Sequence, residues 1–219
     1  MVTAVTNTEP RRRNRRGEGG KLREEIIAAA IALLDEGGDE RAVTLRSVAR
    51  KAGIAAPSIY AHFADQPSIM LAVVQQEMDR LAAALREADE KAGQDPRQRL
   101  FAVCNAYLDV ARQHPQRYRI MFGGLWTPSV EDTSITDDEL ESLGAEALTL
   151  LADVLGACVG AGIAHDSDDL YGDAVALWLG LHGLAHQRAV VRKMPGPADV
   201  AERLITALAH LKSGSLEQG

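Results

Sequence analysis

The sequence predicts an all-α fold, and three features of its composition and periodicity lead to that class. Apolar residues recur at intervals of three and four along nearly the whole chain, which is the spacing of one helix face. No run that alternates apolar and polar residues and is rich in β-branched side chains lies between hairpin turns. Hydrophobic residues make up 46% of the 219 positions and aromatic residues only 4%, so we expect a core of Ala, Leu, Val and Ile between helices.

Glycines, prolines and capping residues set the expected helix boundaries. The polar, arginine-rich residues 1–20 lack periodicity and predict a disordered basic arm. Helical periodicity begins at Lys21 and stops at Gly37. The predicted helices span 21–36, a pair within 44–63, 65–92, 97–112, 115–122, 137–162, 166–193 and 197–212. We expect the helix over 137–162 to bend near Gly156 or Gly160.

The stretch TLRSVARKAGIAAPSIYAHF, from Thr44 to Phe63, predicts two short helices joined by a sharp turn. Thr44 is a candidate N-cap, and Gly53 ends the first helix because glycine accepts backbone angles that other residues avoid. Pro57 suits the first turn of the second helix, whose buried face carries Ile59. This order of elements is the helix-turn-helix, which places its second helix in the major groove of DNA. A packed helical hairpin without nucleic acid is the alternative.

The net charge of −7 is distributed unevenly along the chain. Residues 1–65 carry 11 Lys and Arg against 9 Asp and Glu, whereas residues 66–219 carry 13 against 22. This asymmetry suits a head that faces DNA and an acidic body that stays away from the phosphates. The expected division of the chain is a basic arm over 1–20, a helix-turn-helix head over 21–66, a body over 67–212 and a disordered tail over 213–219.

From Leu22 to Met70 the chain resembles the TetR family of bacterial transcription regulators. The matching residues are Thr44, Val48 to Ala52, Gly53, Ser58, Ile59, Tyr60, His62 and Phe63. The resemblance implies a three-helix head and a six-helix body for ligand binding and dimerisation. It also implies a homodimer that binds double-stranded operator DNA and responds to a small-molecule ligand. Gln66 departs from the pattern, because the family often has a lysine there.

The second helix of the pair has no Arg or Lys between Ile54 and Phe63, so it cannot make the common bidentate contact of Arg with guanine. We expect its small apolar side chains to meet thymine methyl groups and Ser58 to bond to base edges. The resemblance implies phosphate contacts from Tyr60 and His62, and the arginine arm is expected to neutralise phosphates or enter the minor groove. The expected DNA-binding residues are Arg13, Arg15, Arg16, Thr44, Arg46, Ala55, Ala56, Pro57, Ser58, Tyr60 and His62.

The run WLGLHG, from Trp178 to Gly183, resembles the tryptophan…histidine-glycine (WHG) signature in the C-terminal domain of one TetR subgroup. The family places its ligand pocket among the fourth to eighth helices, and apolar walls with a few polar tips suit a small apolar or aromatic ligand. The expected ligand-binding residues are Tyr107, His114, Tyr118, Met121, Phe122, Trp126, Trp178 and His182. Each of these could instead be an ordinary core residue, and His182 could be a buried structural hydrogen-bonding group.

Trp178, His182 and His186 follow one another at intervals of four and therefore share one helix face. Two histidines at this spacing can bind a metal, but no third ligand and no catalytic glutamate accompany them. We therefore expect no metal, no cofactor and no enzyme activity. An enzyme that uses His182 and His186, and a dimerising scaffold that does not bind DNA, are the two alternatives to a regulator.

Two leucine-rich stripes near the C-terminus predict a four-helix dimer interface. The expected dimerisation residues are Leu177, Leu181, Leu184, Arg188, Leu204, Leu208 and Leu211. A dimer would let two reading helices meet successive major grooves, which lie roughly 34–36 Å apart. The alternative is that both stripes close the core of the monomer.

Cys104 and Cys158 lie on apolar helical stretches and are expected to be buried packing residues rather than a redox pair. The polar start of the chain lacks the apolar core of a secretory signal, and no apolar run is long enough for a membrane span. We therefore expect a cytoplasmic protein. From the family resemblance we expect a repressor that its ligand releases from the operator, with a ligand-responsive activator as the alternative.

Overall fold

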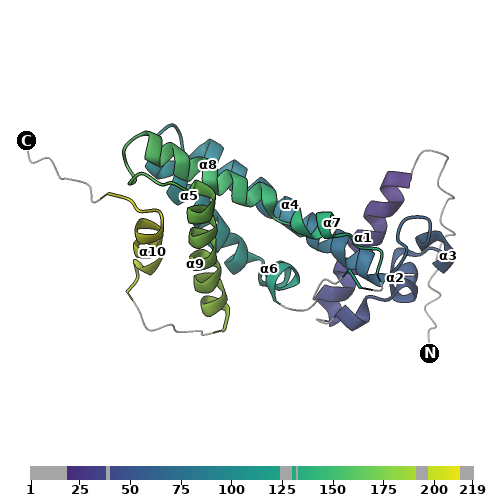
Figure 1. Ribbon diagram of the computed structural model, residues 1–219. Coiled ribbons are helices and arrows are strands. Elements are labelled where there is room, and N and C mark those ends of the chain that lie inside the picture. The colour runs from purple at the N-terminus through teal and green to yellow at the C-terminus, as the bar shows by residue number, and fades with distance from the viewer. Residues whose placement is uncertain (1–18, 38–39, 124–129, 132, 191–196, 213–219) are drawn as a thin grey trace, which may run out of the picture. The chain divides into compact units, whose positions relative to one another are not determined.

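The computed structural model describes residues 19–37, 40–123, 130–131, 133–190 and 197–212, and these ranges hold ten α-helices (Figure 1). The helices are α1 (Gly19–Gly37), α2 (Leu45–Ala52), α3 (Ala56–Ile59), α4 (Gln66–Lys91), α5 (Pro96–Gln113), α6 (Pro115–Phe122), α7 (Asp137–Glu141), α8 (Ala145–Gly160), α9 (Leu170–Val190) and α10 (Val200–Leu208). A 3-10 helix, η1, spans Glu40–Ala42. The all-α class is confirmed.

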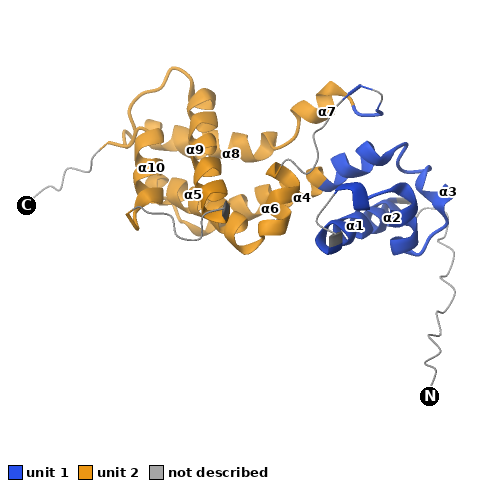
Figure 2. Ribbon diagram, turned by 90° about the horizontal axis from the view of Figure 1, so that it is seen from below, with its two compact units in different colours: residues 1–73, 128–135 blue, residues 74–127, 136–219 orange. Residues whose placement is uncertain are grey.

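The chain folds as two compact units (Figure 2). Unit 1 consists of Met1–Val73 and Pro128–Ile135, and unit 2 consists of Val74–Thr127 and Thr136–Gly219. The first boundary between the units lies inside helix α4, between Val73 and Val74. The segment Pro128–Ile135 belongs to unit 1, although the residues before and after it belong to unit 2. No helix in the described ranges is long and apolar enough to cross a membrane.

Unit 1 is built on the packing of α1 against α2 and of α2 against α3. The buried side of α1 carries Ile26 and Ala30, and α2 contributes Val48. Ile59 and Phe63 complete this core from α3 and the turn that follows it. Ile26 and Ala30 are four residues apart and therefore share the face of α1 that turns away from water.

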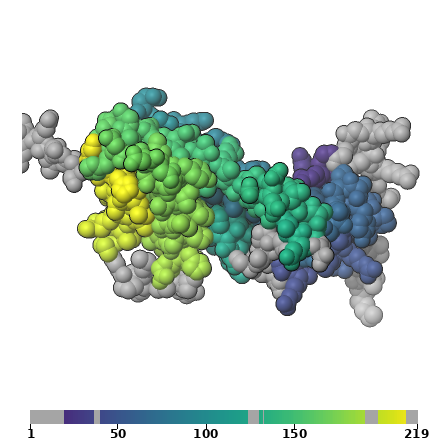
Figure 3. Space-filling model, viewed as in Figure 1, coloured from purple at the N-terminus to yellow at the C-terminus, as the bar shows by residue number. Residues whose placement is uncertain are grey.

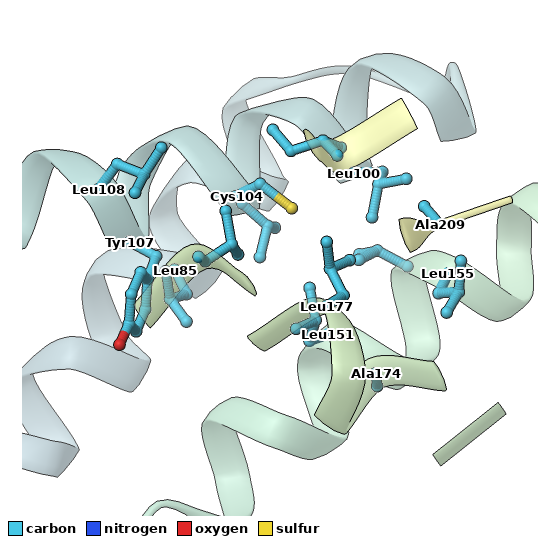
Figure 4. Packing of buried hydrophobic residues seen from close by; sticks show 14 of the residues in the cluster. Leu85, Leu100, Cys104, Tyr107, Leu108, Leu151, Leu155, Ala174, Leu177 and Ala209 are labelled. Carbon is cyan, nitrogen blue, oxygen red and sulfur yellow. The ribbon is translucent and has the colours of Figure 1, made fainter. Parts of the chain in front are cut away.

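Unit 2 is a bundle in which α5, α8 and α9 pack on one another and α10 packs on α9. Figure 4 shows its buried cluster, to which α5 contributes Leu100, α8 contributes Leu155 and α9 contributes Leu177. Cys104 and Cys158 are both free thiols inside this cluster. The Sγ of Cys158 donates a hydrogen bond to the carbonyl oxygen of Pro96, 3.2 Å away. Both cysteines therefore pack as buried side chains.

The expected single helix over 137–162 is wrong, because the structure has two helices there. Thr136 and Glu139 form a capping box that starts α7, and α7 ends after only five residues. The break lies at Gly144, whose φ of +75° is in the left-handed region that favours glycine. Gly156 and Gly160, at which we expected a bend, lie inside or at the end of α8. The sequence has glycine at positions 144, 156 and 160, and it does not show at which of them the helix is interrupted.

Other boundaries also differ from the expectation: helix α9 begins at Leu170 rather than at 166. Helix α10 begins at Val200 rather than at 197, and it ends at Leu208 rather than at 212. Beyond its end, His210 has a φ of +50°, and its carbonyl oxygen accepts a hydrogen bond from the backbone N–H of His165. The backbone groups that a longer helix would use are thus bonded to the segment before α9.

Asp65 joins two parts of unit 1 that are far apart in sequence. Its Oδ1 accepts a hydrogen bond of 2.8 Å from the backbone N–H of Ser68 and so caps helix α4. Its Oδ2 accepts a bond of 2.8 Å from the backbone N–H of Ser134, and the next residue, Ile135, is buried. Burial acts to raise the pKa of Asp65, but the hydrogen bonds from Ser68 and Ser134 outweigh it, and the pKa lies below its ordinary value.

Replacing Asp65 by serine is expected to separate these two roles. Serine still caps a helix, so α4 should start normally, but it cannot reach Ser134 with a second oxygen. We expect the amide hydrogen of Ser134 to exchange roughly tenfold faster, which corresponds to the loss of about one hydrogen bond. Hydrogen-exchange mass spectrometry of the peptide around residue 134 measures this. Unchanged exchange in the Asp65→Ser variant would show that the bond contributes nothing to holding the segment.

Candidate functional site

Helices α2 and α3 form a tight pair whose turn is fixed by local bonds. Thr44 caps α2 by accepting a hydrogen bond of 3.1 Å from the backbone N–H of Ser47, and the Ser47 hydroxyl accepts one of 2.8 Å in return. Gly53 ends α2 with a φ of +67°. Helix α3 then starts from Ala55 with Pro57 in its first turn. The hydroxyl of Thr44, expected to face DNA, therefore serves the cap.

One face of the α3 segment is left open to solvent. Ala55 and Pro57 are exposed, and the Tyr60 side chain is 62% exposed, whereas Ser58 and His62 are half-buried. Ile59 lies between them and is fully buried, so it anchors the helix while its neighbours stay available. The Tyr60 ring does not pack away in the head, which leaves its hydroxyl free to approach a phosphate. Of the residues predicted for base and backbone contacts in this segment, Ala55, Pro57 and Tyr60 are therefore exposed.

Helix α2 carries three cationic side chains. Arg46 and Arg50 are exposed, and Lys51 forms an ion pair with Glu36 of α1. Ala56 is half-buried at the start of α3. The expected contacts from Arg13, Arg15 and Arg16 lie outside the described residues.

Unit 2 contains a cavity of about 130 Å³, hereafter the unit 2 cavity. Its lining residues are Met78, Leu81, Leu85, Val103, Cys104, Tyr107, Phe122, Leu143, Gly144, Ala147, Leu148, Leu151, Trp178 and Leu181. They come from α4, α5, α6, α8, α9 and the turn before α8. Of the expected ligand-binding residues, Tyr107, Phe122 and Trp178 line this cavity. The sequence did not reveal the aliphatic walls, because a Leu or Met that lines a cavity has the same helical spacing as one in a filled core.

A hydrogen-bonded cluster of Tyr107, Tyr118 and His182 adjoins the cavity at Tyr107. The Tyr118 hydroxyl lies 2.6 Å from Nδ1 of His182, and the Tyr107 hydroxyl lies 3.3 Å from the same nitrogen. The two hydroxyl groups are 3.2 Å apart. Burial raises the pKa of both tyrosines. Burial, and then the charge of His186, lower the pKa of His182 below its ordinary value, so its neutral imidazole is favoured.

The other expected ligand-binding residues fall elsewhere. Tyr118 and His182 are not among the lining residues and instead bond to Tyr107. His114 is exposed at the start of α6, and Met121 packs against the buried cluster rather than lining the cavity. Trp126 lies outside the described residues. His182 and His186 have stacked rings with centroids 6.5 Å apart.

The lowered pKa of His182 predicts a pH dependence of stability. The unfolded chain binds a proton near the ordinary pKa of 6.5, whereas the folded chain does so only at lower pH. The stabilisation that neutral His182 contributes to the folded state is therefore fully present above pH 6.5. It is lost as the pH falls from there toward the pKa of His182 in the folded chain. We expect the melting temperature to fall less steeply over this window in His182→Gln than in the wild type. The exposed His114→Gln variant is the control, and equal slopes in wild type and His182→Gln would contradict the assignment.

Helices α9 and α10 together cover one face of unit 2 (Figure 3). Four of the expected dimerisation residues are buried within the single chain, namely Leu177, Leu181, Leu184 and Leu211. They fill the core, as the alternative interpretation has it, and leave no surface for a partner. Arg188 is exposed, and Leu204 and Leu208 are half-buried. The large apolar side chains exposed on α9 are Tyr171 and Leu179, each 55% exposed, and the expected set did not include them.

Two family models match this chain. The model described as bacterial regulatory proteins, tetR family, matches residues 26–73, which include α2 and α3. The model described as Tetracyclin repressor-like, C-terminal domain, matches residues 100–211, about half of the chain. The chain belongs to the TetR family. Helices α2 and α3 of this TetR-family protein are thus the helix-turn-helix of its DNA-binding domain.

A curated relative supports the same assignment over part of the chain. The chain is 32% identical over 132 residues to the HTH-type transcriptional activator FasR of Mycolicibacterium smegmatis. The match covers 55% of this chain and 59% of FasR, so it spans less than two thirds of that relative.

Solved structures share the fold over nearly the whole length. A protein of unknown function from Rhodococcus sp. RHA1 has a TM-score of 0.69 at 25% identity, over 90% of this chain and 95% of that one. The fatty acid degradation regulator FadR from Bacillus halodurans has a TM-score of 0.64 at 15% identity, over 94% and 99% of the two chains. At that identity FadR shows the fold alone.

Proposed function

We propose that this TetR-family protein is a homodimeric transcription regulator whose affinity for operator DNA is set by a small, largely apolar ligand. The observation that carries the proposal is the presence of two sites in one chain. One is a helix-turn-helix with an exposed reading face, and the other is an apolar cavity in unit 2. Protein cores are normally close-packed, so a cavity lined by five helices and a turn indicates a binding site.

DNA recognition rests on small side chains and backbone contacts. Ala55, Pro57 and Ser58 are placed to read base edges and thymine methyl groups, while Tyr60 bonds to a phosphate. Because the segment from Ile54 to Phe63 carries no Arg or Lys, most of the cationic contribution to binding comes from α2 and the arginine arm. Binding is therefore expected to weaken steeply with salt.

The homodimer uses the exposed side of α9. Tyr171 and Leu179 offer apolar area there, and the half-buried Leu204 and Leu208 of α10 lie close to Gly180 of α9. Contiguous exposed apolar area is typical of a protein–protein interaction site, and a second copy of the same face would cover these side chains. Two linked heads then read two half-sites of an inverted repeat.

Ligand control runs through helix α4, which belongs to both units. Met78, Leu81 and Leu85 of this helix line the unit 2 cavity, and the Asp65 cap at its start lies in unit 1. A ligand that prefers one position of α4 changes the affinity for DNA, and DNA changes the affinity for the ligand by the same factor. We propose that the ligand releases the operator, which makes the protein a repressor.

Activation is the second candidate, because the relative FasR is described as an activator. The two functions differ in what the ligand does to DNA binding and in where the binding site lies relative to the promoter. An activator would bind upstream of a promoter and raise transcription in vitro, whereas a repressor would overlap the promoter and lower it.

In vitro selection from random duplex DNA with the full-length protein tests the proposal. We expect an enriched inverted repeat with half-sites about one helical turn apart. Tyr60→Phe should weaken binding to the selected site, because it removes one hydroxyl contact to a phosphate and leaves the ring. Failure to enrich any repeat, with equal binding to all sequences, would overturn the regulator assignment.

A further inference from the structure

One short segment, residues 133–144, begins in unit 1 and ends at the wall of the unit 2 cavity; it is called the strap below. At its start, the backbone N–H of Ser134 donates a hydrogen bond of 2.8 Å to Oδ2 of Asp65, and both residues belong to unit 1. At its end, Leu143 and Gly144 line the cavity. Helix α7 occupies most of the chain between these two points.

The strap is held in shape by hydrogen bonds along its own backbone. Thr136 and Glu139 form the capping box of α7, in which Oε2 of Glu139 accepts from the N–H of Thr136 at 2.9 Å. After α7, the N–H of Leu143 donates to the carbonyl oxygen of Leu140 at 3.2 Å, and Gly144 is the N-cap residue of α8. Each turn is thus bonded to the next, and a bonded chain of turns passes on a displacement at one end instead of absorbing it.

The last residues of the strap are part of the cavity wall. Leu143 and Gly144 lie in this wall together with Ala147 and Leu148, which follow in α8. The backbone of Gly144 packs on α4, because a Cβ built at this glycine would lie 3.6 Å from Sδ of Met78. A ligand that separates this wall from Met78 therefore displaces the end of the strap.

The first residues of the strap are held at the point where the helix-turn-helix joins helix α4. Asp65 follows the buried Phe63 by two positions, and its Oδ1 accepts the N–H of Ser68 to cap α4. The other oxygen of the same carboxylate accepts the N–H of Ser134. Ile135, the next residue of the strap, is buried. A pull on the strap therefore acts on the cap of α4 and on the end of the reading segment.

We propose that the strap is a second route, beside helix α4, by which a ligand in the unit 2 cavity changes DNA binding. The ligand displaces the wall at Leu143 and Gly144, and α7 carries the displacement. The bond from Ser134 to Asp65 delivers it to the segment between α3 and α4. The inference rests on the proposed function and deepens it, because it assigns part of the ligand control to one hydrogen bond and one short helix. By reciprocity, the same route lets operator DNA act on the cavity.

Hydrogen-exchange mass spectrometry of the full-length protein tests the route, with a phenyl ring introduced by Ala147→Phe as the probe in the cavity. We expect the peptide around Ser134 to exchange at least about threefold faster in this variant, while the peptides of α2 keep their rates because unit 1 stays folded. Ala83→Phe, on the exposed side of α4, is the control and should change neither. Leu148→Phe, at another lining position, repeats the comparison if Ala147→Phe does not fold.

Cutting the strap between its two ends distinguishes it from helix α4. The double variant Thr136→Ala, Glu139→Ala removes the capping box of α7 and leaves Asp65 and the cavity residues in place. In this background Ala147→Phe should change the exchange at Ser134 by less than about 1.5-fold, because an α7 without its cap no longer transmits the displacement. A response that keeps its full size in the double variant would show that it travels through α4 and would overturn the inference.

Operator affinity gives a second, functional measurement. Ala147→Phe should raise the Kd for the selected operator at least about fivefold, which is the lower end of ordinary coupling between two sites. In the Asp65→Ser background the same substitution should raise it less than about twofold, because the strap has lost its bond to unit 1. Asp95→Ser is the matched control, since Asp95 caps α5 through the N–H of Arg97 and lies outside the strap. It should leave the effect of Ala147→Phe intact.

The outcomes separate this inference from the proposed function. Unchanged exchange at Ser134 in the cavity-filling variants, or an undiminished effect of Ala147→Phe on the operator in Asp65→Ser, would overturn the strap and leave a ligand-responsive regulator standing. The DNA selection described above uses the unsubstituted protein, so its failure would instead overturn the regulator assignment. The exchange measurement needs no DNA and is read in either case.

Discussion

Replacing Ile59 by alanine is expected to lower the free energy of unfolding by about 2–5 kcal/mol and to abolish specific DNA binding. Ile59 is the one buried residue of the four in helix α3, and none of its surface is exposed. Removing its side chain leaves a cavity under the reading helix, and α3 is too short to hold its position by its own hydrogen bonds. Chemical denaturation gives the stability, and an electrophoretic mobility shift with the selected operator gives the affinity.

The neighbouring residue provides a matched control. Tyr60 is one position further along and its side chain is 62% exposed, so Tyr60→Ala should change the free energy of unfolding by less than about 1 kcal/mol while it still weakens DNA binding. The two variants therefore distinguish a residue that holds α3 in place from a residue that contacts DNA. A stable Ile59→Ala protein that binds the operator normally would show that α3 is positioned by something other than its buried side.

Removing both arginines around Glu77 should destabilise the protein by about 3–5 kcal/mol. Glu77 is the one charged side chain that is buried among the described residues, with 2% exposed. It forms an ion pair with Arg80 on the same helix and lies 3.8 Å from Nε of Arg117 on α6. The double variant Arg80→Met, Arg117→Met leaves a buried carboxylate without a cation. The measurement is the free energy of unfolding from chemical denaturation at neutral pH.

Two controls distinguish this effect from the loss of any ion pair. Adding Glu77→Gln to the double variant removes the buried charge and should recover most of the lost stability. Arg112→Met breaks an exposed pair with Asp109 and should cost less than about 1 kcal/mol. If the double variant is no less stable than Arg112→Met, the buried carboxylate is satisfied by other groups and our account of Glu77 is incorrect.

The ion pair also bears on the ligand control that we propose. Glu77 lies next to the cavity-lining Met78 on α4, and Arg117 projects from α6, the helix that supplies Phe122 to the same cavity. Breaking the pair is therefore expected to alter how a ligand in the cavity acts on α4. We propose that the pair holds α4 and α6 in one packing arrangement, a role that does not require it to add net stability.

The sequence was informative where a residue's role depends on its neighbours along the chain. Gly53 and Pro57 mark the turn of the helix-turn-helix, and Pro115 and Gly123 bound α6, as expected from their fixed backbone preferences. The sequence was less informative about residues that have the same helical spacing but differ in what surrounds them in the folded chain. Leu177 and Leu181 repeat with the spacing of an interface stripe, yet they are core residues, while Tyr171 and Leu179 on the same helix remain exposed.

By itself, the sequence determined the all-α class and the helix-turn-helix. These follow from helical periodicity, capping and turn residues, which act over a few positions. Only the tertiary structure decided that Gly144 rather than Gly156 breaks the chain, that Tyr107 meets Tyr118 and His182, and that leucines from α4 and α8 enclose a cavity. The physical reason is that packing and hydrogen bonding between helices depend on which faces meet in space, and spacing along one helix does not contain that information.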